Sequence, residues 1–343
     1  MAPTEILAQQ HYDSLSGLLS KTGIKLSLLT SSVTAGDKRD VLADLESGKT
    51  DIIIGTHALL EANVLFKNLG LVIIDEQHRF GVNQRNELFL KGISPDLLIM
   101  TATPIPRTLA MTVFAGLDIS VIDALPPGRQ PVKTIVIGSS EEQRAINFVK
   151  NHAALGHQTF VICPLVEESD NIAATAVQEL YGNWSKGAMK DLKLALLHGR
   201  MKGKEKEAVL DSFRKGETDV LISTTVIEVG IDIPNACVML VKDAHRFGLA
   251  QLHQIRGRIG RGSLKGTCLL QYNGKDENVL KRLMVMEKYT DGFAVAEEDL
   301  KLRGPGDIFG TRQHGIPGLA VADLFRDHDI LAEAAEAADA CNL

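Results

Sequence analysis

The sequence predicts an α/β protein made of two parallel-sheet lobes and a helical C-terminal extension. Short runs of Val, Ile and Leu alternate with longer amphipathic stretches, as in chains of βα units. Hydrophobic residues make up 45% of the chain and aromatic residues only 5%, which favours aliphatic parallel-sheet cores. Neither a helix nor a strand continues through Pro126-Pro-Gly-Arg-Gln-Pro131, so we expect the linker between the lobes there.

The expected strands are short apolar runs bounded by polar or turn-forming residues. In the first lobe they are Leu26–Leu29, Asp51–Ile54, Leu71–Ile74, Leu97–Met100 and Ile119–Ile122. In the second lobe they are Thr134–Ile137, Thr159–Ile162, Lys193–Leu197, Val220–Ile222, Val238–Val241 and Thr267–Gln271. From Asp276 onward the pattern becomes helical. We therefore expect three domains: residues 1–130, 131–273 and 274–343.

Two further helices are predicted, at Glu5–Leu19 and at Ser140–Leu155, and Thr4 is a suitable N-cap for the first. An α/β lobe normally begins with a strand, and none precedes Glu5 here. The chain is therefore expected to begin within a domain, with its first lobe truncated at the N-terminus.

Composition limits the possible environments and partners. No apolar run has membrane-spanning length and no signal-peptide pattern is seen, so a cytoplasmic protein without membrane contact is expected. The net charge of −6 calls for a local basic track if nucleic acid is bound, and Arg256, Arg258, Arg261 and Lys265 form one. The cysteines lie far apart, which predicts reduced thiols rather than disulfides or a zinc site: Cys163, Cys237, Cys268 and Cys341.

Ala43-Asp-Leu-Glu-Ser-Gly-Lys-Thr50 matches the loose pattern of a phosphate-binding loop. Such a loop must follow a strand and open a helix, so that backbone N–H groups cradle the phosphates. Here the order is reversed, because a helix over Lys38–Glu46 precedes the segment and a strand follows it. We therefore interpret Gly48 as a helix C-cap, and Lys49 as a residue with no role in nucleotide binding.

Asp75 and Glu76 are the candidate catalytic carboxylates. They follow the apolar run Leu71–Ile74, which is expected to be a buried strand, and so emerge at the carboxyl end of a parallel sheet. Asp75 would bind magnesium through water, and Glu76 would polarise the attacking water during hydrolysis of a nucleoside triphosphate. A strand end leading into an ordinary turn also fits these two residues taken alone.

The second element of the site is Gln254-Ile-Arg-Gly-Arg-Ile-Gly-Arg261. Arg258 and Arg261 follow Gln254 closely enough for one helical turn or tight loop to aim both the same way. Arginines between glycines pack poorly in a core but reach phosphates well. A carboxylate pair together with arginines from another part of the fold is what phosphoryl transfer requires, so the two elements together predict a two-lobed nucleic-acid motor.

Other polar residues follow predicted strands or open predicted helices. Gly230 and Asp232 could approach a ribose or phosphate, or belong to an ordinary loop. Contacts with a nucleic-acid backbone are the functional interpretation of Thr4, Thr56, His57 and His198, and a structural role is the alternative for each. Thr101 and Thr103 could bond the carboxylates and report the nucleotide state, or cap the following helix. Thr224 also follows a strand and is counted with the residues that could couple the site to DNA.

The motifs together resemble those of superfamily 2 helicases, and of the RecG family of branched-DNA helicases most closely. The resemblance runs over nearly the whole chain, and the motifs follow in that family's order. They are Met1-Ala-Pro-Thr-Glu-Ile-Leu-Ala8, Asp75-Glu-Gln-His-Arg-Phe-Gly81, Thr101-Ala-Thr-Pro-Ile-Pro-Arg107, Gln251-Leu-His-Gln-Ile-Arg-Gly-Arg-Ile-Gly-Arg-Gly262, Asp299-Leu-Lys-Leu-Arg-Gly-Pro-Gly306 and Gly310-Thr-Arg-Gln313.

The resemblance implies two RecA-like lobes, ATP and Mg²⁺ as cofactors, and branched double-stranded DNA as partner of a monomeric repair and recombination enzyme. It assigns Asp75 and Glu76 to magnesium and water, and Arg258 and Arg261 to the ATP site across the domain cleft. Arg282, Arg303 and Gln313 correspond to a helical hairpin that couples hydrolysis to translocation. The family's wedge domain and phosphate loop are absent from these residues, so the isolated chain is expected not to hydrolyse ATP.

Two alternatives stay open. The transcription-repair coupling factor shares the hairpin and the Thr-Ala-Thr-Pro segment that starts at Thr101, although Asp75-Glu-Gln-His78 favours RecG. The second alternative is a non-catalytic DNA-binding protein that kept the fold and lost the ability to use ATP. An RNA helicase is disfavoured by the resemblance to the hairpin.

Overall fold

The structure is a computed structural model that describes residues 1–77, 80–102, 118–122, 124–126, 128–164, 170–224, 233–262 and 264–303, with isolated positions between 330 and 341. The chain divides into two compact units, Met1–Thr103 with Val226–Asp232 and Pro104–Thr225 with Ile233–Leu343. Each unit contains its own parallel sheets and its own apolar cluster. The fold is therefore α/β with parallel strands, as predicted.

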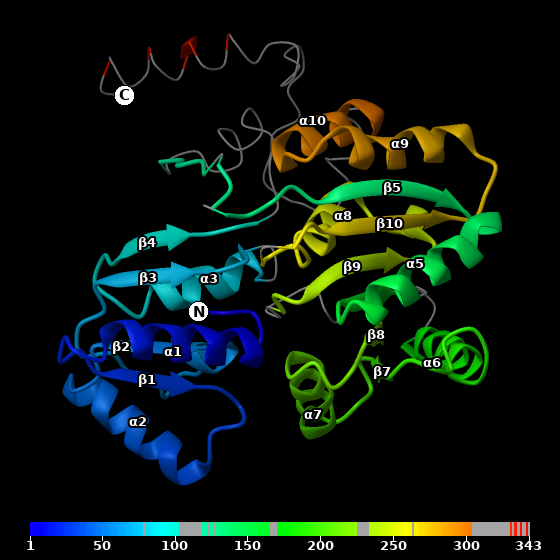
Figure 1. The fold of residues 1–343 in the computed structure, drawn as a ribbon. Helices are drawn as coiled ribbons and strands as arrows, with labels where there is room; N and C mark the ends of the chain where they lie inside the picture. Colours follow the sequence, from blue (N-terminus) through cyan, green and yellow to red (C-terminus); the bar gives the residue numbers. More distant parts are fainter. Residues whose placement is uncertain are drawn as a thin grey trace. The chain divides into compact units, whose positions relative to one another are not determined.

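The first unit contains two pairs of parallel strands (Figure 1). The strand β1 (Leu26–Leu29) pairs with β2 (Ile52–Gly55), and β3 (Leu71–Ile74) pairs with β4 (Asp96–Ile99). The backbone of Met1 and Ala2 connects the pairs, since Ala2 donates to Gly55 and Met1 accepts from Asp75. The helical elements are α1 (Glu5–Leu19), α2 (Ala35–Ser47), the 3-10 turn η1 (His57–Leu60) and α3 (Val82–Phe89).

Helix α2 ends as the sequence predicts. Gly48 is its C-cap, with the left-handed φ of +76°, and the N–H groups of Lys49 and Thr50 both donate to the carbonyl of Asp44. The strand β2 begins four residues after Gly48. The Gly-Lys-Thr segment is thus the end of a helix, and the order of elements excludes the geometry of a phosphate loop there.

The second unit is built on a six-stranded parallel sheet in the order β5-β10-β9-β6-β8-β7. Its strands are β5 (Lys133–Gly138), β6 (Gln158–Ile162), β7 (Leu194–Leu197), β8 (Val220–Ser223), β9 (Ala236–Val241) and β10 (Thr267–Tyr272). All residues of β6, β8 and β9 are buried, as expected of central strands covered by helices on both faces.

The helices of the second unit are α5 (Glu142–Ala154), α6 (Asp170–Lys186), α7 (Gly203–Arg214), α8 (Leu249–Arg256), α9 (Glu277–Lys288) and α10 (Gly292–Arg303), with short 3-10 turns η3 (Ser139–Glu141) and η5 (Ala244–Arg246). Figure 1 shows α9 running alongside β5, the edge strand. None of the helices in the described part of the chain is long and apolar enough to cross a lipid bilayer.

Two expectations about strands were wrong. Residues 118–122 form no strand, and Ile119 and Ile122 are largely exposed, because no neighbouring strand pairs with this apolar run. The strand before Asp75 is buried on one face only. Val72 and Ile74 lie in the core, whereas Leu71 is 53% exposed. The predicted domain boundaries at 130 and 273 stay predictions.

Candidate active site

The carboxylates of Asp75 and Glu76 follow directly from the end of β3. The neighbouring strand β4 ends beside them, since Met100 donates to the carbonyl of Ile74 and accepts from the N–H of Gln77. The carboxyl ends of β3 and β4 therefore meet at one edge, which is where ligands bind in α/β sheets. The position predicted for the carboxylates is confirmed.

Asp75 is held in its ionised form. The Nε2 of His11 in α1 donates to Oδ2 of Asp75 over 3.0 Å, and the backbone N–H of Glu76 donates to Oδ1 over 2.9 Å. The hydrogen bond from His11 lowers the pKa of Asp75 further than partial burial raises it. Each carboxylate oxygen keeps a second lone pair, so Asp75 can also accept from water molecules bound to a cation.

Glu76 is buried, with 7% of its surface exposed, and adopts a left-handed backbone with φ of +51°. Residues other than glycine rarely adopt this conformation, which costs about 1–3 kcal/mol. The backbone N–H of Ala102, which follows β4, donates to its Oε2 over 3.3 Å. The carboxylate is therefore turned toward the loop that begins at Thr101 and is fixed in direction.

In the second unit, Gln254 lies in α8, and Arg258 and Arg261 lie in the tight loop that follows this helix. Glycines shape the loop. Gly260 has φ of +66°, and a Cβ at Gly262 would lie 2.9 Å from the carbonyl oxygen of Pro234. The N–H of Gly260 donates to the carbonyl of Ala236, so the loop rests on the start of β9. Of the two arrangements expected, the tight loop is the one observed.

Arg256 differs from the prediction that it belongs to a solvent-facing basic track. It is 3% exposed, and its guanidinium donates to the carbonyls of Met286, Tyr289 and Thr290 at 2.8–2.9 Å. It also donates to Nδ1 of His253 over 2.8 Å. Arg256 therefore ties α8 to the end of α9 and the segment before α10, and it is unavailable to a nucleic acid.

The side chains predicted to contact DNA differ in how accessible they are. The Thr4 hydroxyl accepts from the N–H of Leu7 as the N-cap of α1, and Thr56 is buried before η1. His57 and Thr101 are exposed, and the ring of His57 lies 5.3 Å from that of Phe80.

His198 and Thr224 directly follow β7 and β8 and are buried. Arg282 in α9 donates to the carbonyls of His245 and Phe247, so it joins α9 to the segment before α8. The remaining predicted positions lie outside the described residues or, for Arg303, have an undescribed side chain: Thr103, Gly230, Asp232, Gln313 and Arg303.

The sequence did not reveal that His11 contacts Asp75, nor that Arg256 is a buried residue that joins two helices. The contact between His11 and Asp75 joins residues distant in the chain, and nothing in the local pattern of α1 indicates it. Arg256 carried one usable signal, since it continues the buried face of α8 that Leu249, Leu252 and Ile255 form. That Asp75 and Glu76 share one ATP site with Arg258 and Arg261 stays a prediction.

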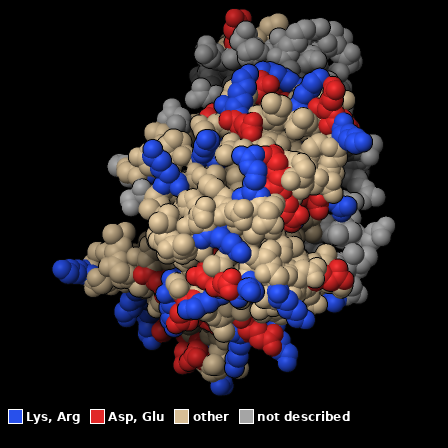
Figure 2. Space-filling model, turned by 45° about the vertical axis from the view of Figure 1, so that its right-hand side comes forward, with Lys and Arg blue, Asp and Glu red and all other residues tan. Residues whose placement is uncertain are grey.

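Figure 2 shows basic and acidic side chains intermingled on the face in view, consistent with the modest net charge of −6. No continuous field of one sign marks a nucleic-acid surface on this face of the described residues.

Three families match successive parts of the chain. They are DEAD/DEAH box helicase over residues 1–112, helicase conserved C-terminal domain over 141–263, and ATP-dependent DNA helicase RecG, domain 3, C-terminal, over 289–341. Two curated relatives described as ATP-dependent DNA helicase RecG come from Synechocystis, 48% identical over 99% of the chain, and Bacillus subtilis, 46% identical over 100%. The chain spans 41% and 50% of these relatives, that is, half of their length or less.

Among solved structures, RecG bound to a three-way DNA junction is 44% identical with a TM-score of 0.76, over 96% of this chain and 43% of that one. The helicase MrfA bound to DNA is 18% identical with a TM-score of 0.63, over 85% of this chain and 44% of that one, which indicates a shared fold alone. Sequence identity near one half over almost every residue, together with the match to RecG domain 3, shows that the chain is similar to RecG helicases over the part of their length that it spans.

Proposed function

We propose that the chain forms the motor part of an ATP-dependent helicase that acts on branched DNA. The observation that carries the proposal is the match of residues 289–341 to a domain described as RecG domain 3, beside matches of residues 1–112 and 141–263 to two helicase families. The relatives are named as ATP-dependent DNA helicases, and one of the similar structures holds a three-way DNA junction. This match favours RecG over the transcription-repair coupling factor.

The carboxylates are suited to hydrolysis of a nucleoside triphosphate. Magnesium-bound ATP would supply the phosphoryl group that water attacks. Asp75 fits the metal, because it is ionised and retains lone pairs for metal-bound water. Glu76 fits the attacking water, because burial and the N–H of Ala102 fix the direction of its carboxylate. Arg258 and Arg261 would stabilise charge on the transferred group, and Gln254 would orient them or the phosphate.

The accessible side chains suggest which groups contact the DNA. His57 and Thr101 are exposed and could reach a phosphate, whereas Thr56, His198 and Thr224 are buried and could act only through their backbone N–H groups. The family resemblance supplies four further roles. Gly230 and Asp232 would lie near the nucleotide, and Thr103 and Gln313 would lie near the DNA. We expect one monomer to act on each DNA molecule.

The proposal is tested in a polypeptide in which this chain replaces the matched half of the Bacillus subtilis relative. Phosphate release is measured with and without a DNA fork, for the unaltered chimera and for Glu76→Gln. We expect DNA-stimulated turnover that falls by roughly 10²–10³ in Glu76→Gln, in line with removal of a general base or electrostatic group. Glu46→Gln, on the exposed face of α2, is the matched control. Binding of the fork without any turnover would instead support a DNA-binding remnant.

A further inference from the structure

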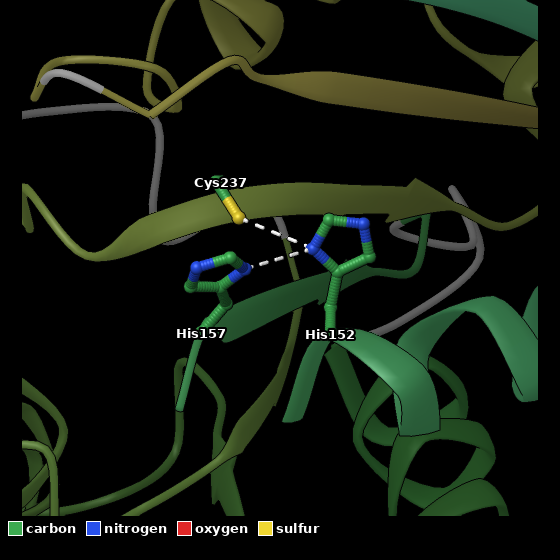
Figure 3. Close-up of side chains that lie close together, drawn as sticks. All are labelled: His152, His157 and Cys237. Carbon is green, nitrogen blue, oxygen red and sulfur yellow. Dashed lines mark hydrogen bonds between the residues drawn. The ribbon is translucent and has the colours of Figure 1, made fainter. Parts of the chain in front are cut away.

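Three side chains with metal-binding atoms meet at the amino end of β6 and β9 (Figure 3). His152 lies in the last turn of α5, His157 directly precedes β6, and Cys237 is the second residue of β9. The Nδ1 of His152 lies 3.0 Å from Nδ1 of His157 and 3.5 Å from Sγ of Cys237. The ligand atoms of all three residues lie within 4.8 Å of one another.

The backbone around the cluster is held in place. After α5 the chain turns at Gly156, which has φ of +79°, and the N–H of His157 donates to the carbonyl of His152. The side chain of Asn235 donates to the carbonyl of Gly156 over 2.8 Å and so links this turn to the segment before β9. The side chains therefore converge because two loops are joined, and the site is largely formed without a ligand.

The distances approach those of a tetrahedral metal site. Zinc lies roughly 2.0–2.1 Å from imidazole nitrogen and roughly 2.3 Å from thiolate sulfur, so neighbouring ligands lie roughly 3.3–3.6 Å apart. The two contacts of His152 are close to these values. A pair of ligand atoms at the 4.8 Å limit would have to approach by roughly 1.2–1.5 Å through side-chain rotation. His152 and His157 are half-buried, which leaves room for a water molecule as fourth ligand.

We propose that His152, His157 and Cys237 bind one transition-metal cation of the Zn²⁺ class. A thiolate with two imidazoles selects such a cation over Mg²⁺ and Ca²⁺, which prefer oxygen ligands. Burial, and then the neighbouring His157, lower the pKa of His152, which favours the neutral ring that a ligand needs. Burial raises the pKa of the Cys237 thiol, which opposes its ionisation, so the cation must displace the thiol proton to solvent when it binds.

The proposed site lies close to the loop that bears Arg258 and Arg261. Ala236, the residue before Cys237, accepts the hydrogen bond from Gly260, and Gly262 packs on Pro234. A bound cation would therefore fix the start of the strand on which this loop rests. The role is structural, and it holds whether or not the chain takes part in ATP hydrolysis.

The experiment titrates Co²⁺, an optical probe for Zn²⁺ sites, into the reduced 343-residue chain. We expect one Co²⁺ per chain with a thiolate-to-metal charge-transfer band, and displacement of Co²⁺ by Zn²⁺. Cys237→Ser should lose this band, and His157→Asn should weaken binding by more than about tenfold. Cys163→Ser is the matched control, since this thiol is also buried but has Lys242 and Asp243 as its charged neighbours. It should bind as the unaltered chain does.

Three results would overturn the proposal: no charge-transfer band, a band that survives Cys237→Ser, or equally weak binding in every variant. Circular dichroism of the metal-free variants shows whether each is folded. If Cys237→Ser does not fold, His157→Asn decides the question, because this residue lies in a half-buried turn. Zn²⁺ should raise the melting temperature of the unaltered chain but not that of His157→Asn.

Discussion

At the scale of single residues, the buried guanidinium of Arg256 has consequences for stability that can be measured. Its donors satisfy three backbone carbonyls near the end of α9, and removal would leave those oxygens without these donors. Arg256→Met should lower the free energy of unfolding by about 1–3 kcal/mol in urea denaturation, the cost of leaving a hydrogen-bond acceptor without its donor. Arg200→Met, at an exposed position, is the control and should change it by less than about 0.5 kcal/mol. Similar losses in both variants would show that the contacts of Arg256 are unimportant.

His253, which accepts from Arg256, makes stability depend on pH. Burial, and then the charge of Arg256, lower the pKa of His253 to about 4, so the folded state favours the neutral ring. The neutral His253 ring therefore adds to the free energy of unfolding above the unfolded-state pKa of about 6.5. This stabilisation is lost as the pH falls toward 4. The loss should reach up to about 3 kcal/mol. His253→Gln cannot titrate, so its unfolding free energy should fall less between pH 7 and 4.5. Parallel pH profiles would contradict this assignment.

At the scale of elements, the end of α2 distinguishes a helix cap from a nucleotide site. Lys49 follows the C-cap and lies 3.3 Å from Asp44, on the surface. Lys49→Ala should therefore leave nucleotide affinity unchanged in a fluorescent-nucleotide titration of the chimera. Gly48→Ala should lower the free energy of unfolding by about 1 kcal/mol, because Gly48 needs a positive φ. A large loss of nucleotide affinity in Lys49→Ala would mean that the segment binds phosphate after all.

At the scale of the whole molecule, the two units differ in how many strands support one another. Among the described residues, the strands of the first unit form two-stranded sheets, and Leu71 and Ile73 on β3 are 53% and 41% exposed, whereas six strands pair in the sheet of the second unit. Two-stranded sheets leave a larger share of their backbone groups at sheet edges than a six-stranded sheet does, even though Met1 and Ala2 join the two pairs. Hydrogen exchange on a polypeptide of these 343 residues should therefore be fast in residues 20–75 and slow in β6, β8 and β9. Equal protection in both units would refute this expectation.

Sequence alone predicted most of the strands to within two residues, because the apolar runs are bounded by polar and turn residues. It failed at Ile119–Ile122, where apolar residues have no strand to pair with, and at Arg256, where tertiary contacts bury a residue type that is usually exposed. It placed Asp75 and Glu76 correctly because both follow a strand directly. Contacts between distant segments, such as His11 with Asp75 or His152 with Cys237, leave no local pattern and required the structure.

The most direct test of the motor proposal measures ATP turnover and fork unwinding on the same preparations of the chimera. We expect Arg258→Ala and Arg261→Ala to lose both activities by orders of magnitude, because transition-state charge is no longer stabilised. Arg303→Ala and Gln313→Ala should keep much of the ATP turnover and lose unwinding, since the hairpin is proposed to convert hydrolysis into movement of DNA. If the hairpin variants lose both activities in proportion, or neither, the chain is not the coupled branched-DNA motor proposed.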